Sequence, residues 1–154
     1  MKAVLLHETD GLRTFGVVLA TGDEAMSSLT SFAAEHRLRA TQLTAIGAFS
    51  RLVVAFFDWT TRQYQHIRID EQVEVLSLLG DVTLEEGQPK VHAHVVIGKR
   101  DGTAHGGHLV EGLVRPTLEV MLTETPAHLR RRFDPDSGLA LINPTDAVRR
   151  SERT

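Results

Sequence analysis

Four of the eight histidines lie within 17 consecutive positions, from His92 to His108. The first two belong to the segment Val-His-Ala-His-Val-Val-Ile at 91–97, whose β-branched residues favour a strand. Side chains alternate between the two faces of a strand, so His92 and His94 project from one face about 6.6 Å apart along the backbone. Neutral imidazole is a common ligand of zinc and similar divalent ions, so these two side chains can supply two nitrogen ligands to one site.

His108 is the predicted third ligand. The run Gly-Lys-Arg-Asp-Gly-Thr at 98–103 is rich in turn residues, which predicts that the chain reverses and lays residues 105–110 beside the first strand. Gly106 and Gly107 have no Cβ atom, and they permit the close backbone approach that would bring His108 to the other two histidines.

Two other interpretations of this cluster stay open. Histidines on the solvent face of an amphipathic strand need have no chemical role, and His105 is a solvated loop residue unless it supports the ligands or shuttles protons. Cupins also begin a metal site with His-x-His, but a glutamate follows within a few residues. Here no carboxylate occurs in the six positions after His94, and the next glutamate is Glu111.

We therefore predict zinc, or another divalent metal, on His92, His94 and His108 with one coordination position open.

Length and composition indicate one globular domain. The 154 residues suffice for a sizeable core, and 42% hydrophobic with 24% charged residues is ordinary for a globular protein. The absence of cysteine excludes disulfides and thiolate metal sites and is compatible with the cytoplasm. No apolar run approaches the roughly 20 residues of a membrane span, and the first apolar run is too short for a signal peptide. We expect a cytoplasmic protein without membrane contact.

One helix and a series of strands are predicted to position the histidines. Thr21 and Glu24 match a capping box, which starts a helix that continues to about Arg37 with an apolar stripe at helical spacing. Strands are expected at 2–7, 13–20, 41–49, 51–59, 63–70, 73–84, 90–98 and 117–124. This order indicates an α+β fold: a single domain with a mainly antiparallel β-sheet and one principal α-helix.

The periodic pattern ends near Pro126. We therefore divide the chain into a domain over 1–125 and a C-terminal extension over 126–154, whose tail is predicted to be mobile from about residue 145. The run Arg130-Arg131-Arg132 in this extension is either an anion-binding patch or, as is commoner for a short charge run, a solvated surface.

Three stretches of the sequence resemble the plants-and-prokaryotes conserved (PPC) domain of the prokaryotic stand-alone type. They are Glu-Gln-Val-Glu-Val-Leu-Ser-Leu-Leu-Gly-Asp-Val at 71–82, Pro-Lys-Val-His-Ala-His-Val at 89–95 and Asp-Gly-Thr-Ala-His-Gly-Gly-His-Leu at 101–109. The likeness extends over roughly residues 3–125. It implies a largely antiparallel α+β fold, a homotrimer and, in prokaryotic members, a metal usually assigned as zinc on three histidines, which are the three predicted above.

The resemblance also carries a DNA-binding label. Plant relatives join this domain to AT-hooks, Arg-Gly-Arg-Pro segments that enter the minor groove, and stand-alone prokaryotic members are often described as DNA-binding. This chain contains no Arg-Gly-Arg-Pro, and its net charge of −3 and pI of about 6.2 leave no strongly basic surface. We predict weak duplex binding without sequence preference, through the basic clusters at 130–132 and 149–153.

Glu74 has two interpretations. Plant members have Gly-Arg-Phe-Glu where this chain has Glu-Gln-Val-Glu at 71–74, so the final glutamate is shared while the arginine is not. Glu74 is expected to alternate with Leu76 and Leu78 on one strand face, where it could be buried near the metal as a hydrogen-bond acceptor or general base. The alternative is an edge carboxylate paired with an arginine.

Two classes of function follow from these residues. The first is a trimeric binding or regulatory module, whose metal is structural or senses a small-molecule ligand. The second is a zinc-dependent enzyme of the hydrolase or lyase type, in which metal-bound water acts on a small molecule and Glu74 is the catalytic acid/base. No phosphate loop, dinucleotide motif or serine-nucleophile motif accompanies the histidines, so we favour the module. A closed metal site would favour the structural role.

Overall fold

The computed structural model describes residues 1–144 of the chain. Within that range the strands are β1 (Lys2–Thr9), β2 (Leu12–Ala20), β3 (Ala40–Asp58), β4 (Gln63–Ile69), β5 (Val73–Glu85), β6 (Gln88–Gly98), β7 (Ala104–Glu124), β8 (Arg130–Asp134) and β9 (Leu139–Asn143), and the helix is α1 (Ala25–Glu35). The tail that we predicted to be mobile from residue 145 lies outside the described residues.

The strands form one sheet in the order β1-β2-β7-β3-β5-β8-β9, in which β4 pairs with β3, and β6 bridges β5 and β7. Every pairing is antiparallel except that of β5 with β8, where Leu84 lies opposite Arg130. The predicted single, mainly antiparallel sheet with one principal helix is therefore confirmed, with the difference that the sheet is mixed and dominates the fold.

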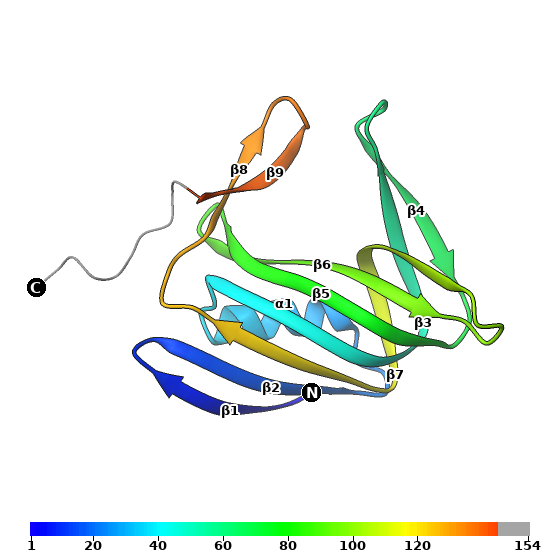
Figure 1. Ribbon diagram of the computed structural model, residues 1–154, viewed down its shortest axis with the longest axis horizontal. Helices are drawn as coiled ribbons and strands as arrows, with labels where there is room; N and C mark the ends of the chain where they lie inside the picture. The colour runs from blue at the N-terminus through cyan, green and yellow to red at the C-terminus, as the bar shows by residue number, and fades with distance from the viewer. Residues whose placement is uncertain (145–154) are drawn as a thin grey trace, which may run out of the picture.

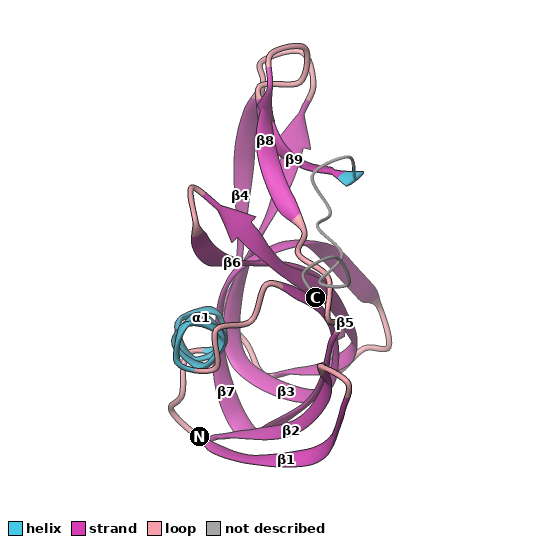
Figure 2. Ribbon diagram, turned by 90° about the vertical axis from the view of Figure 1, so that its left-hand side faces the viewer, coloured by secondary structure: helices cyan, strands magenta, loops and turns pink. Residues whose placement is uncertain are grey.

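Helix α1 covers one face of this sheet and contacts β6 and β7, as the side view in Figure 2 shows. Its buried residues include Leu29, Phe32 and Ala33, the stripe that the helical spacing predicts. They pack against inward-facing apolar residues of the strands, among them Leu118 and Val95, which are almost fully buried. The helix is too short and too polar to span a membrane, as holds for any helix in the described part of the chain.

The predicted helix start at Thr21 is wrong. Glu24 is the N-cap, and its carboxylate accepts hydrogen bonds from the amides of Met26 at 3.0 Å and Ser27 at 2.7 Å. The same carboxylate accepts from the Gly112 amide at 3.0 Å, which ties the helix start to β7. The Thr21 hydroxyl donates instead to the Pro116 carbonyl, because residues 20–23 form a turn that delays the helix.

Two strands are longer than the sequence pattern predicts. The segments 41–49 and 51–59 form the single strand β3, and β7 extends the predicted 117–124 back to Ala104. Their mutual register shifts at three places between Gly47 and Val54, so the inward and outward alternation changes phase there. Bulges of this kind bend the strands, and the sequence pattern is interrupted although the strand continues.

Two hairpins rise from the same side of the sheet (Figure 1). One consists of the end of β3 with β4, and the other of β8 with β9. The sequence predicted a polar, turn-like segment where β8 lies and a short apolar island where β9 lies, and neither strand was predicted because both carry few buried apolar residues. The second hairpin is attached to the sheet where the Leu84 amide donates to the Leu129 carbonyl at 2.8 Å.

Candidate metal centre

The structure brings the three predicted histidines together. His92 and His94 project from the same face of β6, and His108 on β7 lies directly opposite His94. One ring nitrogen of each residue lies within 4.8 Å of the others, and the ring centroids are 5.0–5.4 Å apart. His105 lies opposite Ile97, is exposed and does not belong to this cluster.

Two glycines allow β7 to approach its neighbours here. A Cβ atom at Gly106 would lie 2.7 Å from the Val95 carbonyl oxygen of β6, and one at Gly107 would lie 2.9 Å from the Ala55 carbonyl oxygen of β3. Any side chain at these positions would push the strands apart, since real Cβ atoms essentially never come within 3.0 Å of such an atom. The predicted role of the Gly-Gly pair is therefore confirmed: it sets the distance at which His108 meets the other histidines.

The electrostatics of the triad suit a cation. Burial, followed by the charges of His92 and His94, lowers the pKa of His108 to about 4. Burial and the charge of His92 also lower the pKa of His94. Both rings are therefore neutral at pH 7, the state in which imidazole can donate a lone pair to a metal. The Nδ1 atom of His108 is buried and has no hydrogen-bond partner among the described residues, a deficit that a coordinated cation could remove.

The side chains of Asp81 and Arg131 lie next to His92 Nδ1. Asp81 lies opposite His92 on β5, with its Oδ2 atom 3.6 Å from His92 Nδ1. Arg131 of β8 donates to both Asp81 carboxylate oxygens at 2.9 and 3.1 Å, to the Thr83 hydroxyl at 2.9 Å and to the Ala140 carbonyl at 3.0 Å. Burial alone would raise the pKa of Asp81, but hydrogen bonds and charges from His92 and Arg131 hold it below its usual value.

This arrangement can fix the orientation of His92. A histidine that binds a metal through Nε2 carries its proton on Nδ1, and it commonly donates that proton to a carboxylate. Asp81 is the nearest carboxylate that could accept it, at an ion-pair distance of 3.6 Å. The Arg131 guanidinium, which can only donate and lies 3.2 Å from His92 Nδ1, would have to turn away from that nitrogen once it carries the proton.

The predicted solvated surface at 130–132 is wrong for the middle residue, because the Arg131 side chain is only 9% exposed while its two neighbours face outward. The extension that we predicted to begin at residue 126 thus contributes to the site.

Glu74 is not brought to the histidines. It lies opposite Gly98, at the end of β6 remote from His92, and its side chain is exposed. The expected alternation with Leu76 and Leu78 fails because the register shifts between Val75 and Ser77, so Leu76 is 55% exposed whereas Leu78 is buried. The sequence analysis chose Glu74 and missed Asp81, although a β5–β6 pairing in register would have placed Asp81 beside His92.

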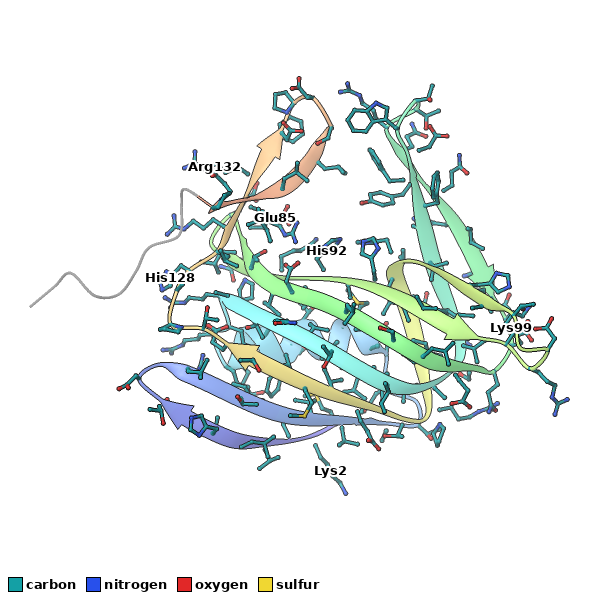
Figure 3. The ribbon with its side chains drawn as sticks, in the orientation of Figure 1. Lys2, Glu85, His92, Lys99, His128 and Arg132 are labelled. Carbon is teal, nitrogen blue, oxygen red and sulfur yellow. The ribbon has the colours of Figure 1, made fainter. Side chains whose placement is uncertain are left out.

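The three histidines line a cavity of about 670 Å³ between the two hairpins. Figure 3 shows two of its lining residues, His92 and Glu85, on the side of the sheet from which the hairpins rise. The lining also includes Ala55, Phe56, Phe57 and Tyr64 from the first hairpin, Leu139, Ala140 and Leu141 from the second, and Lys90, Val91, Gly107 and Arg131. The Tyr64 ring lies over His108, with their centroids 5.2 Å apart. The histidine cluster is therefore open to a space that can hold a small molecule.

Comparison with known proteins places the chain in one family. The sequence pattern of the Plants and Prokaryotes Conserved (PCC) domain matches residues 6–126. Among curated proteins, the chain is 29% identical over 133 residues to the Bifunctional protein GlmU of Synechococcus sp. (strain JA-3-3Ab), a match that covers 84% of this chain and 20% of that protein. The chain thus spans about one fifth of the length of this relative.

Solved structures with the same fold come from archaea and bacteria. A PPC protein of Pyrococcus horikoshii is 30% identical with a TM-score of 0.80, and the match covers 89% of this chain and 97% of that one. A metal-containing protein of Archaeoglobus fulgidus is 31% identical with a TM-score of 0.81, covering 93% and 99%. A Bacteroides thetaiotaomicron protein with a provisional DNA-binding description is 23% identical with a TM-score of 0.81, covering 89% and 94%, which shows the fold alone.

Proposed function

We propose that this chain, which belongs to the Plants and Prokaryotes Conserved (PCC) domain family, is a trimeric metal-binding module that binds a small molecule beside its metal. The observation that carries the proposal is the position of the histidine triad at the floor of the cavity between the hairpins. A structural zinc site is usually closed by four protein ligands, whereas three protein ligands leave a position for a further molecule.

The donor set suits zinc. Three imidazole nitrogens without thiolates are typical of zinc sites that keep an open position, and zinc supplies a Lewis acid there when it is bound. His92, His94 and His108 would hold the ion, and Asp81 would orient His92 through its Nδ1 proton. The likeness to the metal-containing protein of Archaeoglobus fulgidus supports the binding of a metal.

An exposed apolar face supports the homotrimer. The sheet face opposite α1 carries a group of exposed apolar side chains, namely Val4, Leu6, Val18, Ile46, Leu76, Leu79 and Met121. The group is continuous across the strands because Met121 lies opposite Gly16 and Thr44, and Thr44 lies opposite Leu79. A large exposed apolar patch commonly marks a protein contact, and closed symmetry would bury it in every copy. Light scattering at micromolar concentration should give three chain masses, and a monomer mass would contradict the trimer.

A catalytic role is the second candidate, and it rests on two other groups that line the same cavity. Glu85 offers a carboxylate and Tyr64 a phenol near the histidines. Either group can accept or donate a proton to a bound molecule, whereas Glu74 is too remote to do so. If the protein has turnover, Glu85→Gln should abolish it while the metal content is unchanged.

Cobalt substitution tests whether the metal site is open. Cobalt(II) is expected to bind the wild-type protein and to give the intense visible absorption of a low-coordinate site. Azide should then change that spectrum, because an open position admits an external ligand. His108→Ala should lose the cobalt spectrum, whereas the matched variant His105→Ala should keep both the spectrum and the azide response. A spectrum of bound cobalt that azide does not change would indicate a closed, structural site.

A further inference from the structure

The cavity has two unlike parts. Its walls are apolar: Phe56, Phe57 and Tyr64 come from the first hairpin, and Leu139 and Leu141 from the second. Phe56 is 63% exposed and Leu141 is 44% exposed, so both present apolar surface that no other part of the described chain covers. The floor, in contrast, consists of the histidine triad and charged side chains. A molecule that fills this space must combine an apolar body with a polar end.

The charges of the floor determine which polar end fits. Lys90 lies 3.6 Å from Glu85, and Arg131 is paired with Asp81, so these four charges balance. An imidazole that holds a metal is neutral. A divalent cation on the triad would therefore leave the floor with its full positive charge. An anionic group is favoured at such a position, because the surrounding walls weaken screening by water.

The groups that remain available distinguish between anions. The Arg131 guanidinium already donates to Asp81, Thr83 and Ala140, so it has few N–H groups left for a ligand. Lys90 has a side chain that is 60% exposed, and its ammonium group can turn toward the cavity. A single carboxylate, held by the cation and by one ammonium group, matches this supply better than a phosphate with three anionic oxygens.

The shape of the apolar part follows from the aromatic wall. The Tyr64 ring packs against His108 at 5.2 Å and against Phe57 at 5.2 Å between centroids. Flat rings in such a wall offer stacking surfaces to a flat ligand. The volume of about 670 Å³ lies within the range of small-molecule sites and exceeds the needs of a bare anion.

We propose that the physiological ligand is a small carboxylate with a flat apolar body, whose carboxylate meets the metal while the body lies between the hairpins. This inference rests on the proposed function, since it requires the metal. It adds the chemical class of the ligand, which neither the family membership nor the triad specifies.

Benzoate is the probe, and calorimetry of the zinc-loaded, full-length protein measures its binding. Burial of the ring should make benzoate bind at least about tenfold more tightly than acetate, which corresponds to ~1.4 kcal/mol and is less than burial of one aromatic side chain provides. Benzamide has the same shape without the charge, so it should bind at least about tenfold more weakly than benzoate. Removal of zinc should abolish the difference between benzoate and benzamide.

Two pairs of variants separate this site from general effects. Phe56→Ala should weaken benzoate binding without changing acetate binding, whereas Trp59→Ala should change neither. Trp59 is a fair control because it is 62% exposed on the same hairpin but does not line the cavity. Lys90→Met should weaken the binding of both benzoate and acetate, whereas Lys99→Met should weaken neither. Lys99 is also in an ion pair, with Glu71, at the other end of β6 (Figure 3).

The outcomes distinguish this inference from the proposed function. Zinc binding with equal affinities for benzoate and acetate, or for benzoate and benzamide, would overturn the ligand class and leave the metal module intact. Failure to bind zinc would overturn the proposed function itself. Equal losses in Phe56→Ala and Trp59→Ala would show that benzoate binds elsewhere, and would also overturn the inference.

Discussion

Asp81→Asn should weaken zinc binding without unfolding the protein. Asp81 is the only described carboxylate paired with a histidine of the triad, at 3.6 Å from Oδ2 to His92 Nδ1. Asparagine keeps the shape of aspartate but loses the charge that favours a proton on Nδ1. Loss of such an outer partner typically lowers metal affinity by about 10–100-fold, or ~1.4–2.7 kcal/mol.

The structure indicates where in that range the effect falls. The 3.6 Å separation and the 33% exposure of the His92 side chain argue for the lower end. Arg131 argues for the upper end, because its guanidinium is 9% exposed, lies 3.2 Å from His92 Nδ1 and would lose its paired charge. We therefore expect a loss near 100-fold in Asp81→Asn. The double variant with Arg131→Met should recover about tenfold of it, since the uncompensated cation is then gone.

A competition titration with a chromophoric chelator measures these affinities, and circular dichroism checks the fold. Glu74→Gln is the matched control, because Glu74 is an exposed carboxylate on the same strand that does not reach the triad. It should bind zinc as the wild type does. An Asp81→Asn affinity within about threefold of the wild type, or an equal loss in Glu74→Gln, would refute the orienting role.

Three further predictions concern stability, strand packing and DNA. In chelator-treated protein the free energy of unfolding should fall as the pH drops from about 6.5 to about 4, because His108, with its folded pKa of about 4, is protonated at a lower pH in the folded chain than in the unfolded chain. Urea titrations at several pH values should show a smaller pH dependence of this free energy for His108→Gln. Gly106→Ala should weaken zinc binding by at least about tenfold, because its Cβ would lie 2.7 Å from the Val95 carbonyl and separate β6 from β7; unchanged affinity would contradict this packing. With a net charge of −3, the protein should bind duplex DNA weakly near about 150 mM salt, and nanomolar, sequence-selective binding that survives removal of residues 145–154 would contradict this expectation.

The triad could be predicted because its geometry depends on local rules. Strand alternation places His92 and His94 on one face, and a turn followed by two glycines returns His108 to them. The family resemblance, which rested on the same residues, is confirmed by the match over residues 6–126. Alternation fails where a strand is bulged, and for that reason β3 was divided in two and Leu78 was placed on the same face as Glu74.

The arrival of Arg131 beside the triad could not be predicted by these rules. Asp81 and Arg131 are 50 positions apart, and they meet because β8 returns beside β5 in a parallel pairing. Residues 130–134 are mostly polar and have no hydrophobic periodicity from which this pairing with β5 could be predicted. The cavity has the same origin, since its walls belong to two hairpins that are remote in the sequence.

Metal stoichiometry tests the central claim most directly. Elemental analysis of protein purified without a histidine tag should give about one divalent metal, predominantly zinc, per chain. His108→Ala should lose that metal because two imidazoles alone hold zinc weakly, whereas His105→Ala should retain it. Full occupancy in His108→Ala, or no metal in the wild-type protein after growth with zinc, would contradict the assignment of this site.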